Sequence, residues 1–131
     1  MQTSNPTNAK DLCENFLRTT RELIEHASGL IQVIEAGDME EGYVIQNSNT
    51  PVLLIRFAGV DTTKEVYIDP RPANAINATV FDDLELAMRK ARAVKNAAGD
   101  RFIVVPRVDA LRTCVANWET LIATVQEQNR V

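Results

Sequence analysis

The chain has few of the residues on which metal sites, phosphate-binding loops and membrane spans depend. Its 131 residues include two cysteines, Cys13 and Cys114, one histidine, His26, and five glycines. Two distant cysteines and one histidine do not supply the short ligand spacing of a zinc site. The glycines are isolated, so there is no glycine-rich phosphate cradle. No apolar run approaches the roughly 18 residues of a membrane span. The sequence therefore argues against each of these classes.

Recognisable catalytic groups are also scarce. There is no Gly-x-Ser-x-Gly nucleophile motif, and His26 lies on the flank of a predicted helix. The acidic stretch from Glu35 to Glu41 does not follow the spacing of an EF-hand calcium loop. Asp82 and Asp83 are better explained by the dipole at the start of a helix than by acid–base chemistry. We therefore expect a non-enzymatic protein with no cofactor and no metal.

The composition is that of one ordinary globular domain, with 45% hydrophobic and 24% charged residues. We expect a single domain over residues 1–131, in which residues 1–5 are flexible. The start of the chain has no basic segment followed by an apolar core, so we expect no signal peptide. Cys13 and Cys114 each lie within an apolar helical stripe, which favours two reduced, separate thiols. These features predict a cytoplasmic protein.

A long N-terminal helix is predicted over residues 6–36. Asn5 and Pro6 form a typical helix start, and Gly37 is a natural terminator. An alternative breaks the helix at Ser28-Gly29 and makes residues 30–35 a strand, because glycine is unfavourable inside a helix. So long a helix in so small a protein suggests packing against another subunit. We therefore expect a homo-oligomer, with four apolar helical residues at the interface: Leu23, Ile31, Leu111 and Trp118.

The rest of the chain predicts strands followed by alternating helices and strands. Short β-branched and aromatic runs at residues 43–46, 52–57 and 64–68 are separated by turn-rich segments. An irregular connection follows at 70–74, then a helix over 81–98 capped by Thr79 and Asp82 and closed by Gly99. A fourth strand over 102–105 and a last helix capped by Asp109 complete the chain. This predicts an α+β fold of order α-β-β-β-α-β-α, whose helices pack on one face of a small antiparallel sheet.

Charge is the one uneven feature of the sequence. The whole chain has 14 basic and 18 acidic residues, a net charge of −4. Within residues 89–112, however, basic residues far outnumber the two acidic ones, Asp100 and Asp109. The seven basic residues of this segment are Arg89, Lys90, Arg92, Lys95, Arg101, Arg107 and Arg112. If they share one surface, they can replace the counterions of a polyanion.

Two function classes remain open for such a protein. The first is a regulatory protein that binds single-stranded nucleic acid, DNA in particular, through the basic segment. Stacking of bases would require aromatic platforms, for which Tyr43, Phe57 and Tyr67 are candidates. The second is a protein–protein adaptor, chaperone-like protein or inhibitor, such as one carried by a phage against a host machine. An acidic protein is the other possible partner of the basic segment, whereas an adaptor would keep its partner when Arg89, Lys90, Arg92 and Lys95 are changed to Glu.

Overall fold

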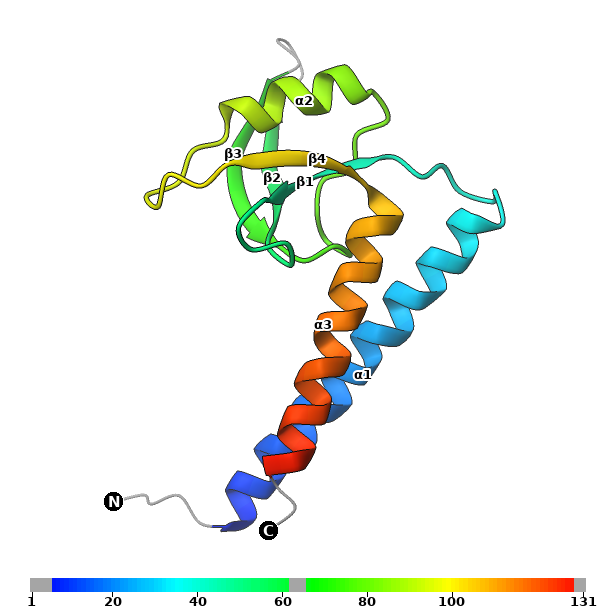
Figure 1. The fold of residues 1–131 in the computed structure, drawn as a ribbon, viewed down its shortest axis with the longest axis vertical. Coiled ribbons are helices and arrows are strands. Elements are labelled where there is room, and N and C mark those ends of the chain that lie inside the picture. Colours follow the sequence, from blue (N-terminus) through cyan, green and yellow to red (C-terminus); the bar gives the residue numbers. More distant parts are fainter. Residues whose placement is uncertain (1–5, 62–65, 129–131) are drawn as a thin grey trace.

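The computed structural model describes residues 6–61 and 66–128, which form three helices and four strands (Figure 1). The predicted flexible start at residues 1–5 lies outside the described residues. The α+β class and the predicted order of elements are confirmed. In chain order the elements are α1 (Pro6–Glu35), β1 (Tyr43–Asn47), β2 (Leu54–Asp61), β3 (Val66–Ala73), α2 (Leu84–Ala93), β4 (Phe102–Pro106) and α3 (Arg107–Gln128).

Helix α1 is one continuous helix of 30 residues, so the alternative strand at residues 30–35 is wrong. Its end is fixed by two backbone bonds. The N–H of Gly37 donates to Ile34 O at 3.0 Å, and that of Asp38 donates to Val33 O at 3.1 Å. This pairing requires a left-handed residue just past the helix, and Gly37 has a φ of 82°. The terminator predicted from the sequence is therefore the one the fold uses.

The four strands form one antiparallel sheet of order β3-β2-β1-β4. Strand β3 continues through Pro70 and Pro72 to Ala73, so the predicted irregular connection over residues 70–74 is wrong. The two prolines pair with Phe57 and Ile55 of β2. Because β3 is an edge strand, the backbone N–H groups of alternate residues point away from β2 and form no hydrogen bond within the sheet. Proline lacks this N–H, so two prolines at alternate positions are accommodated on the outer side of β3.

Helices cover both faces of the sheet, which corrects the expectation that they pack on one face. Alternate side chains of a strand point to opposite faces. Ile45 and Ile55 pack with α2 residues such as Ala87, whereas Val44 and Leu54 belong to the cluster formed with α1 and α3. Figure 1 shows α2 and the α1–α3 pair on different sides of the sheet. The chain therefore has two small cores separated by the sheet.

Helix α2 is shorter than the predicted helix over 81–98. It begins after Asp83, whose Oδ1 accepts the backbone N–H of Glu85 at 2.9 Å, so the predicted cap at Thr79 and Asp82 is wrong. The hydroxyl of Thr79 instead accepts the N–H of Phe57 at 2.8 Å. At the other end, α2 stops at Ala93 and not at Gly99. Residues 94–101 are consequently a turn that leads into β4.

Helix α3 starts at Arg107, directly after β4 and two residues before the predicted cap at Asp109. It lies beside α1, and the two helices extend together away from the sheet as a hairpin (Figure 1). Leu111 and Trp118 of α3 are buried in the cluster that also contains Val44 and Leu54 of the sheet. Among the described residues, none of the three helices has the length and apolar character needed to cross a bilayer.

Candidate anion-binding site

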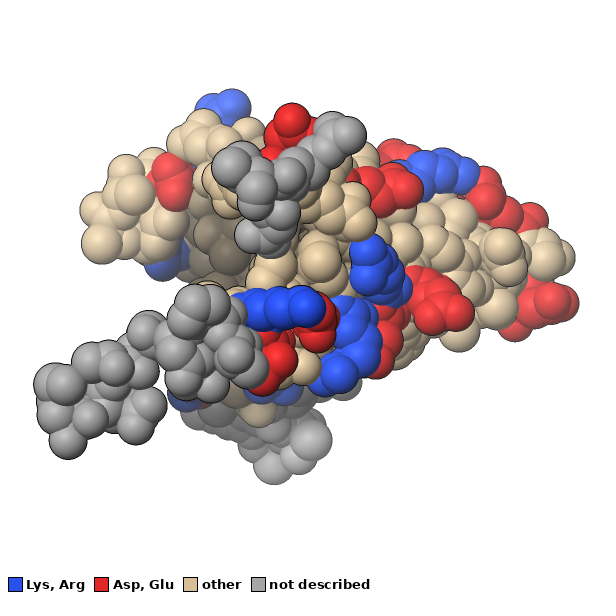
Figure 2. Space-filling model, turned by 90° about the horizontal axis from the view of Figure 1, so that it is seen from below, with Lys and Arg blue, Asp and Glu red and all other residues tan. Residues whose placement is uncertain are grey.

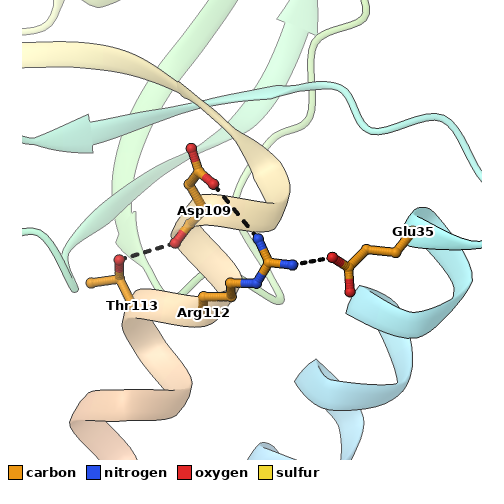
Figure 3. Close-up of polar contacts among 4 residues, drawn as sticks. All are labelled: Glu35, Asp109, Arg112 and Thr113. Carbon is orange, nitrogen blue, oxygen red and sulfur yellow. Dashed lines mark hydrogen bonds and ion pairs between the residues drawn. The ribbon is translucent and has the colours of Figure 1, made fainter.

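The seven basic residues of segment 89–112 do not form one surface, because the last two lie on α3. Arg112 forms an ion pair with Glu35 at the end of α1, and its Nη1 lies 4.0 Å from Asp109 Oδ1. Figure 3 shows the guanidinium between these two carboxylates. The hydroxyl of Thr113 donates to Asp109 O at 3.0 Å within the same turn. Arg112 therefore joins α1 to α3, and its charge is already matched.

Arg107 is also committed within the fold. Its guanidinium is partly buried at the junction of β4 and α3, and burial lowers its pKa from the usual value. Its Nη1 donates to Met39 Sδ at 3.5 Å, and its Nε is buried without a hydrogen-bond partner among the described residues. Because the group contacts the loop after α1, it is poorly placed to meet a large partner. Arg107 and Arg112 thus fall outside the candidate site.

Three of the remaining cations converge where α2 ends and β4 begins. Arg92, Lys95 and Arg101 line a hollow of about 560 Å³, whose other lining residues come from α2, the following turn and Phe102. All three side chains are exposed. Among the described residues, no carboxylate lies within 4.0 Å of their charged nitrogens. We call this feature the basic hollow.

Asp100 also lines the basic hollow, and its carboxylate holds two turns of the chain together. Its carboxylate accepts hydrogen bonds from the side-chain amides of Asn47, Asn49 and Asn96, at 2.8 to 2.9 Å. These three bonds lower the pKa of Asp100. The arrangement ties the turn after β1 to the turn after α2. Asp100 is thus a structural acceptor whose oxygens are occupied by neutral donors.

Arg89 and Lys90 lie on α2 near the hollow but do not line it. Arg89 is exposed and Lys90 is half-buried. On a different part of the molecule, the distal end of the hairpin, Figure 2 shows Lys and Arg atoms interleaved with Asp and Glu atoms. A surface of mixed sign there contrasts with the three cations of the hollow. Of the seven basic residues predicted as one cluster, only Arg92, Lys95 and Arg101 line the basic hollow.

An apolar groove adjoins the basic hollow and was not predicted. It has a volume of about 370 Å³ and lies between α2 and β4, lined mainly by Leu84, Met88, Ile103 and Val104. The groove and the hollow share Ala91, Arg92 and Phe102, so they lie side by side on the α2–β4 surface. The available signal in the sequence was the spacing of Leu84 and Met88, which are four residues apart and therefore share one face of a helix.

Of the four predicted interface residues, two are half-buried and two are buried in the single chain. Leu23 and Ile31 are half-buried on α1. Leu111 and Trp118 belong to the core of the single chain, which leaves little of either side chain exposed for contact with a second copy. Large apolar side chains that remain exposed on the hairpin lie elsewhere, at Leu12, Phe16, Val33 and Leu121. Leu12 and Phe16 are near the start of α1, beyond the part of the helix that packs on the sheet.

Two of the three candidate aromatic platforms pack against a core of the protein, and the third lies outside the described side chains. Tyr43 and Phe57 pack against the core around α2, where the rings of Phe57 and Phe81 meet edge to face at 6.2 Å. The side chain of Tyr67 lies outside the described residues. Within residues 6–61 and 66–128, no three metal-ligating side chains come together. Comparison of the chain with protein-family models, curated proteins and solved structures finds no match.

Proposed function

We propose that this chain is a non-enzymatic binding protein that holds an acidic segment of a partner protein in the basic hollow. The observation that carries the proposal is the convergence of Arg92, Lys95 and Arg101 on one depression, without intramolecular ion pairs among the described residues. Exposed cations without carboxylate partners attract an acidic partner, raise its association rate and favour it over partners of the same charge sign. Asp100 also lines the hollow, but its carboxylate accepts hydrogen bonds from three asparagine side chains, so the three cations outnumber the one acidic group there.

A protein partner is favoured over a nucleic acid by what surrounds the hollow. The hollow adjoins the apolar groove beside Leu84 and Met88, which suits aliphatic side chains. Stacking of bases needs exposed aromatic faces, and Tyr43 and Phe57 are half-buried against the core around α2. An adaptor, chaperone-like protein or inhibitor therefore fits the site better than a binder of single-stranded DNA.

The test uses a fluorescein-labelled decamer of glutamate and two matched triple variants. Arg92→Glu, Lys95→Glu and Arg101→Glu together reverse the hollow. Lys10→Glu, Arg18→Glu and Arg21→Glu make the same change of net charge on the exposed side of α1. We expect the first triple variant to weaken binding at least tenfold at physiological salt, while the second changes it less than twofold, because separated exposed charges are screened. Equal losses in the two variants, or no binding by the wild type, contradict the proposal.

Single-stranded nucleic acid is the second candidate, favoured by the continuation of positive charge from the hollow to Arg89 along α2. A titration with a labelled oligothymidylate at two salt concentrations distinguishes the two. If about three phosphates contact the protein, the logarithm of the binding constant falls with the logarithm of salt concentration with a slope of about −2. DNA is the partner if the protein binds the oligothymidylate more tightly than the glutamate decamer and if Arg89→Glu abolishes that binding.

We also propose that two copies associate through the distal end of the hairpin. Leu12 and Phe16 are large, exposed and one helical turn apart. Their exposed helical neighbours Ala9, Asn15 and Thr19 are uncharged. The same face of a second copy can therefore meet this one in a symmetric contact without burying like charges.

The mass of the protein in solution tests this association. We expect a dimer for the wild type and a single chain for Phe16→Lys. Val33→Lys is the matched control, since it adds the same charge at an exposed apolar position near the other end of α1. A single chain for the wild type at high concentration, or a dimer that survives Phe16→Lys, removes the proposal. Cys13 is half-buried on α1 and Cys114 is buried on α3. Cysteines placed singly on helices are typical of proteins in a reducing compartment, and we propose that the protein acts in the cytoplasm.

A further inference from the structure

Strand β4 is at the edge of the sheet, and its outer side has free backbone groups. The N–H of Ser48 donates to Arg101 O at 2.9 Å, and the N–H of Arg107 donates to Gly42 O at 3.1 Å. In this register the odd-numbered residues of β4 bond to β1. The N–H and C=O groups of Phe102 and Val104 therefore point away from the sheet. No strand among the described residues lies beside them.

The apolar groove runs along this same edge. Leu84 and Met88 of α2 are each 45% exposed, although they lie four residues apart on the side of the helix that borders β4. Phe102 and Val104 pack on the α2 side of the sheet. A fifth strand placed beside β4 would have its alternate side chains under α2, where they would cover Leu84 and Met88.

From this geometry we infer that β4 and α2 together bind an extended peptide segment, which adds to the sheet as a fifth strand. The inference rests on the proposed function and specifies how the acidic partner is held. Backbone bonds to Phe102 and Val104 would supply affinity, and side-chain pockets along α2 would supply specificity. The occupant is a segment of a partner protein that carries aliphatic and acidic residues in alternation.

The spacing of the two elements defines the motif. Four residues of α2 span about 6 Å, and two residues of a strand span about 6.7 Å. Successive inward-facing residues of the peptide therefore match Leu84, Met88 and Arg92 in turn. The first two contacts are apolar, and the third lies at the entrance of the basic hollow.

The direction of the peptide follows from pairing. Helix α2 and strand β4 are consecutive and joined by one short turn, so Arg92 lies near Phe102 and Leu84 lies near the other end of β4. In the more stable antiparallel pairing, the added strand runs toward Phe102. The motif is then apolar-x-apolar-x-acidic, read from the amino end of the peptide. Pro106 has no N–H, which limits pairing at the other end of β4.

Fluorescence polarisation with labelled seven-residue peptides tests the inference. The set carries Ile, Leu, Val or Phe at both apolar positions and Glu at the acidic position, and each peptide has a scrambled partner of the same composition. We expect at least one member to bind at least tenfold more tightly than its scrambled partner. Methylation of the peptide amide that faces Val104 should abolish this preference, while methylation of the next amide should leave it.

Two protein variants complete the experiment. Met88→Lys should weaken binding at least tenfold, whereas Val33→Lys, which adds the same charge on α1, should not. Arg92→Glu should lose the Glu peptide and gain one with Lys at that position, an exchange that a folding defect cannot produce. If scrambled peptides bind equally and methylation has no effect, strand addition is wrong, while the glutamate decamer still decides the proposed function. If no acidic peptide binds at all, both proposals are wrong.

Discussion

Replacing Leu111 by alanine is expected to destabilise the protein strongly, because this side chain joins the hairpin to the sheet. Leu111 is 0% exposed and belongs to the same cluster as Val44, Leu54 and Trp118. A buried leucine truncated to alanine costs about 2 to 5 kcal/mol, from lost transfer free energy and from the cavity that remains. The total stability of a domain is about 5 to 15 kcal/mol, so the loss is a large fraction of it.

Urea denaturation measures this loss directly. For a loss of about 3 kcal/mol and a slope of about 2 kcal/mol per molar, the midpoint falls by about 1.5 M. Trp118 is the only tryptophan of the chain and lies in the cluster with Leu111, so its fluorescence reports the hairpin. Far-ultraviolet circular dichroism reports all helices, and two protein concentrations separate folding from association.

Leu12→Ala is the matched control, since it makes the same chemical change on the other helix of the hairpin. Leu12 is 70% exposed. We therefore expect a change below about 0.5 kcal/mol in the single chain. Equal midpoint shifts for Leu111→Ala and Leu12→Ala would refute the reasoning, because burial would then not determine the cost.

Four further predictions concern single residues. Gly42 has a φ of 69° and an added Cβ there would collide with a neighbouring side chain, so Gly42→Ala should lower stability by about 1 kcal/mol or more. Gly29 lies in α1 with open space around it, so Gly29→Ala should instead raise stability by about 0.5 to 1 kcal/mol; thermal unfolding of both variants checks the opposite signs. Burial raises the pKa of Cys114, whereas Cys13 is only half-buried, so mass spectrometry after brief alkylation of the native protein should find the label on Cys13. Hydrogen bonds lower the pKa of Asp100, so its ionised form stabilises the fold above the ordinary aspartate pKa, and this contribution is lost as the pH falls through the folded value. The stability difference between wild type and Asp100→Ala should therefore shrink when urea denaturation is repeated at about pH 3 and compared with pH 7.

Local signals in the sequence were sufficient for the elements whose ends depend on local geometry. Gly37 ends α1 because a left-handed residue is required there, and no distant contact is involved. The apolar period of α1 is likewise visible in the sequence. By contrast, the end of β3 depends on its place at the sheet edge, where Pro70 and Pro72 need no partner. A single sequence does not contain that information, so the prolines suggested an irregular connection.

The two faces of the sheet illustrate the same limit. The pairs Val44-Ile45 and Leu54-Ile55 are apolar on both sides, which in a strand indicates burial on both faces. This signal was present in the sequence. The third predicted strand suggests the opposite, because Val66 and Ile68 alternate with the polar residues Glu65 and Asp69, which is typical of a sheet with one solvated face. The side chains of residues 65–68 lie outside those the structure describes.

The candidate site depends most on where α2 ends. Had the helix continued to residue 98, Lys95 would lie one turn beyond Arg92 on a straight, solvated face, and Arg101 would begin a separate strand. Because α2 stops at Ala93, the chain turns at Val94 and is held there by the bonds from Asn47, Asn49 and Asn96 to Asp100. That turn brings Lys95 and Arg101 to the lining of one hollow. The asparagines of the two turns, and not the count of basic residues, therefore determine whether this protein has an anion-binding site.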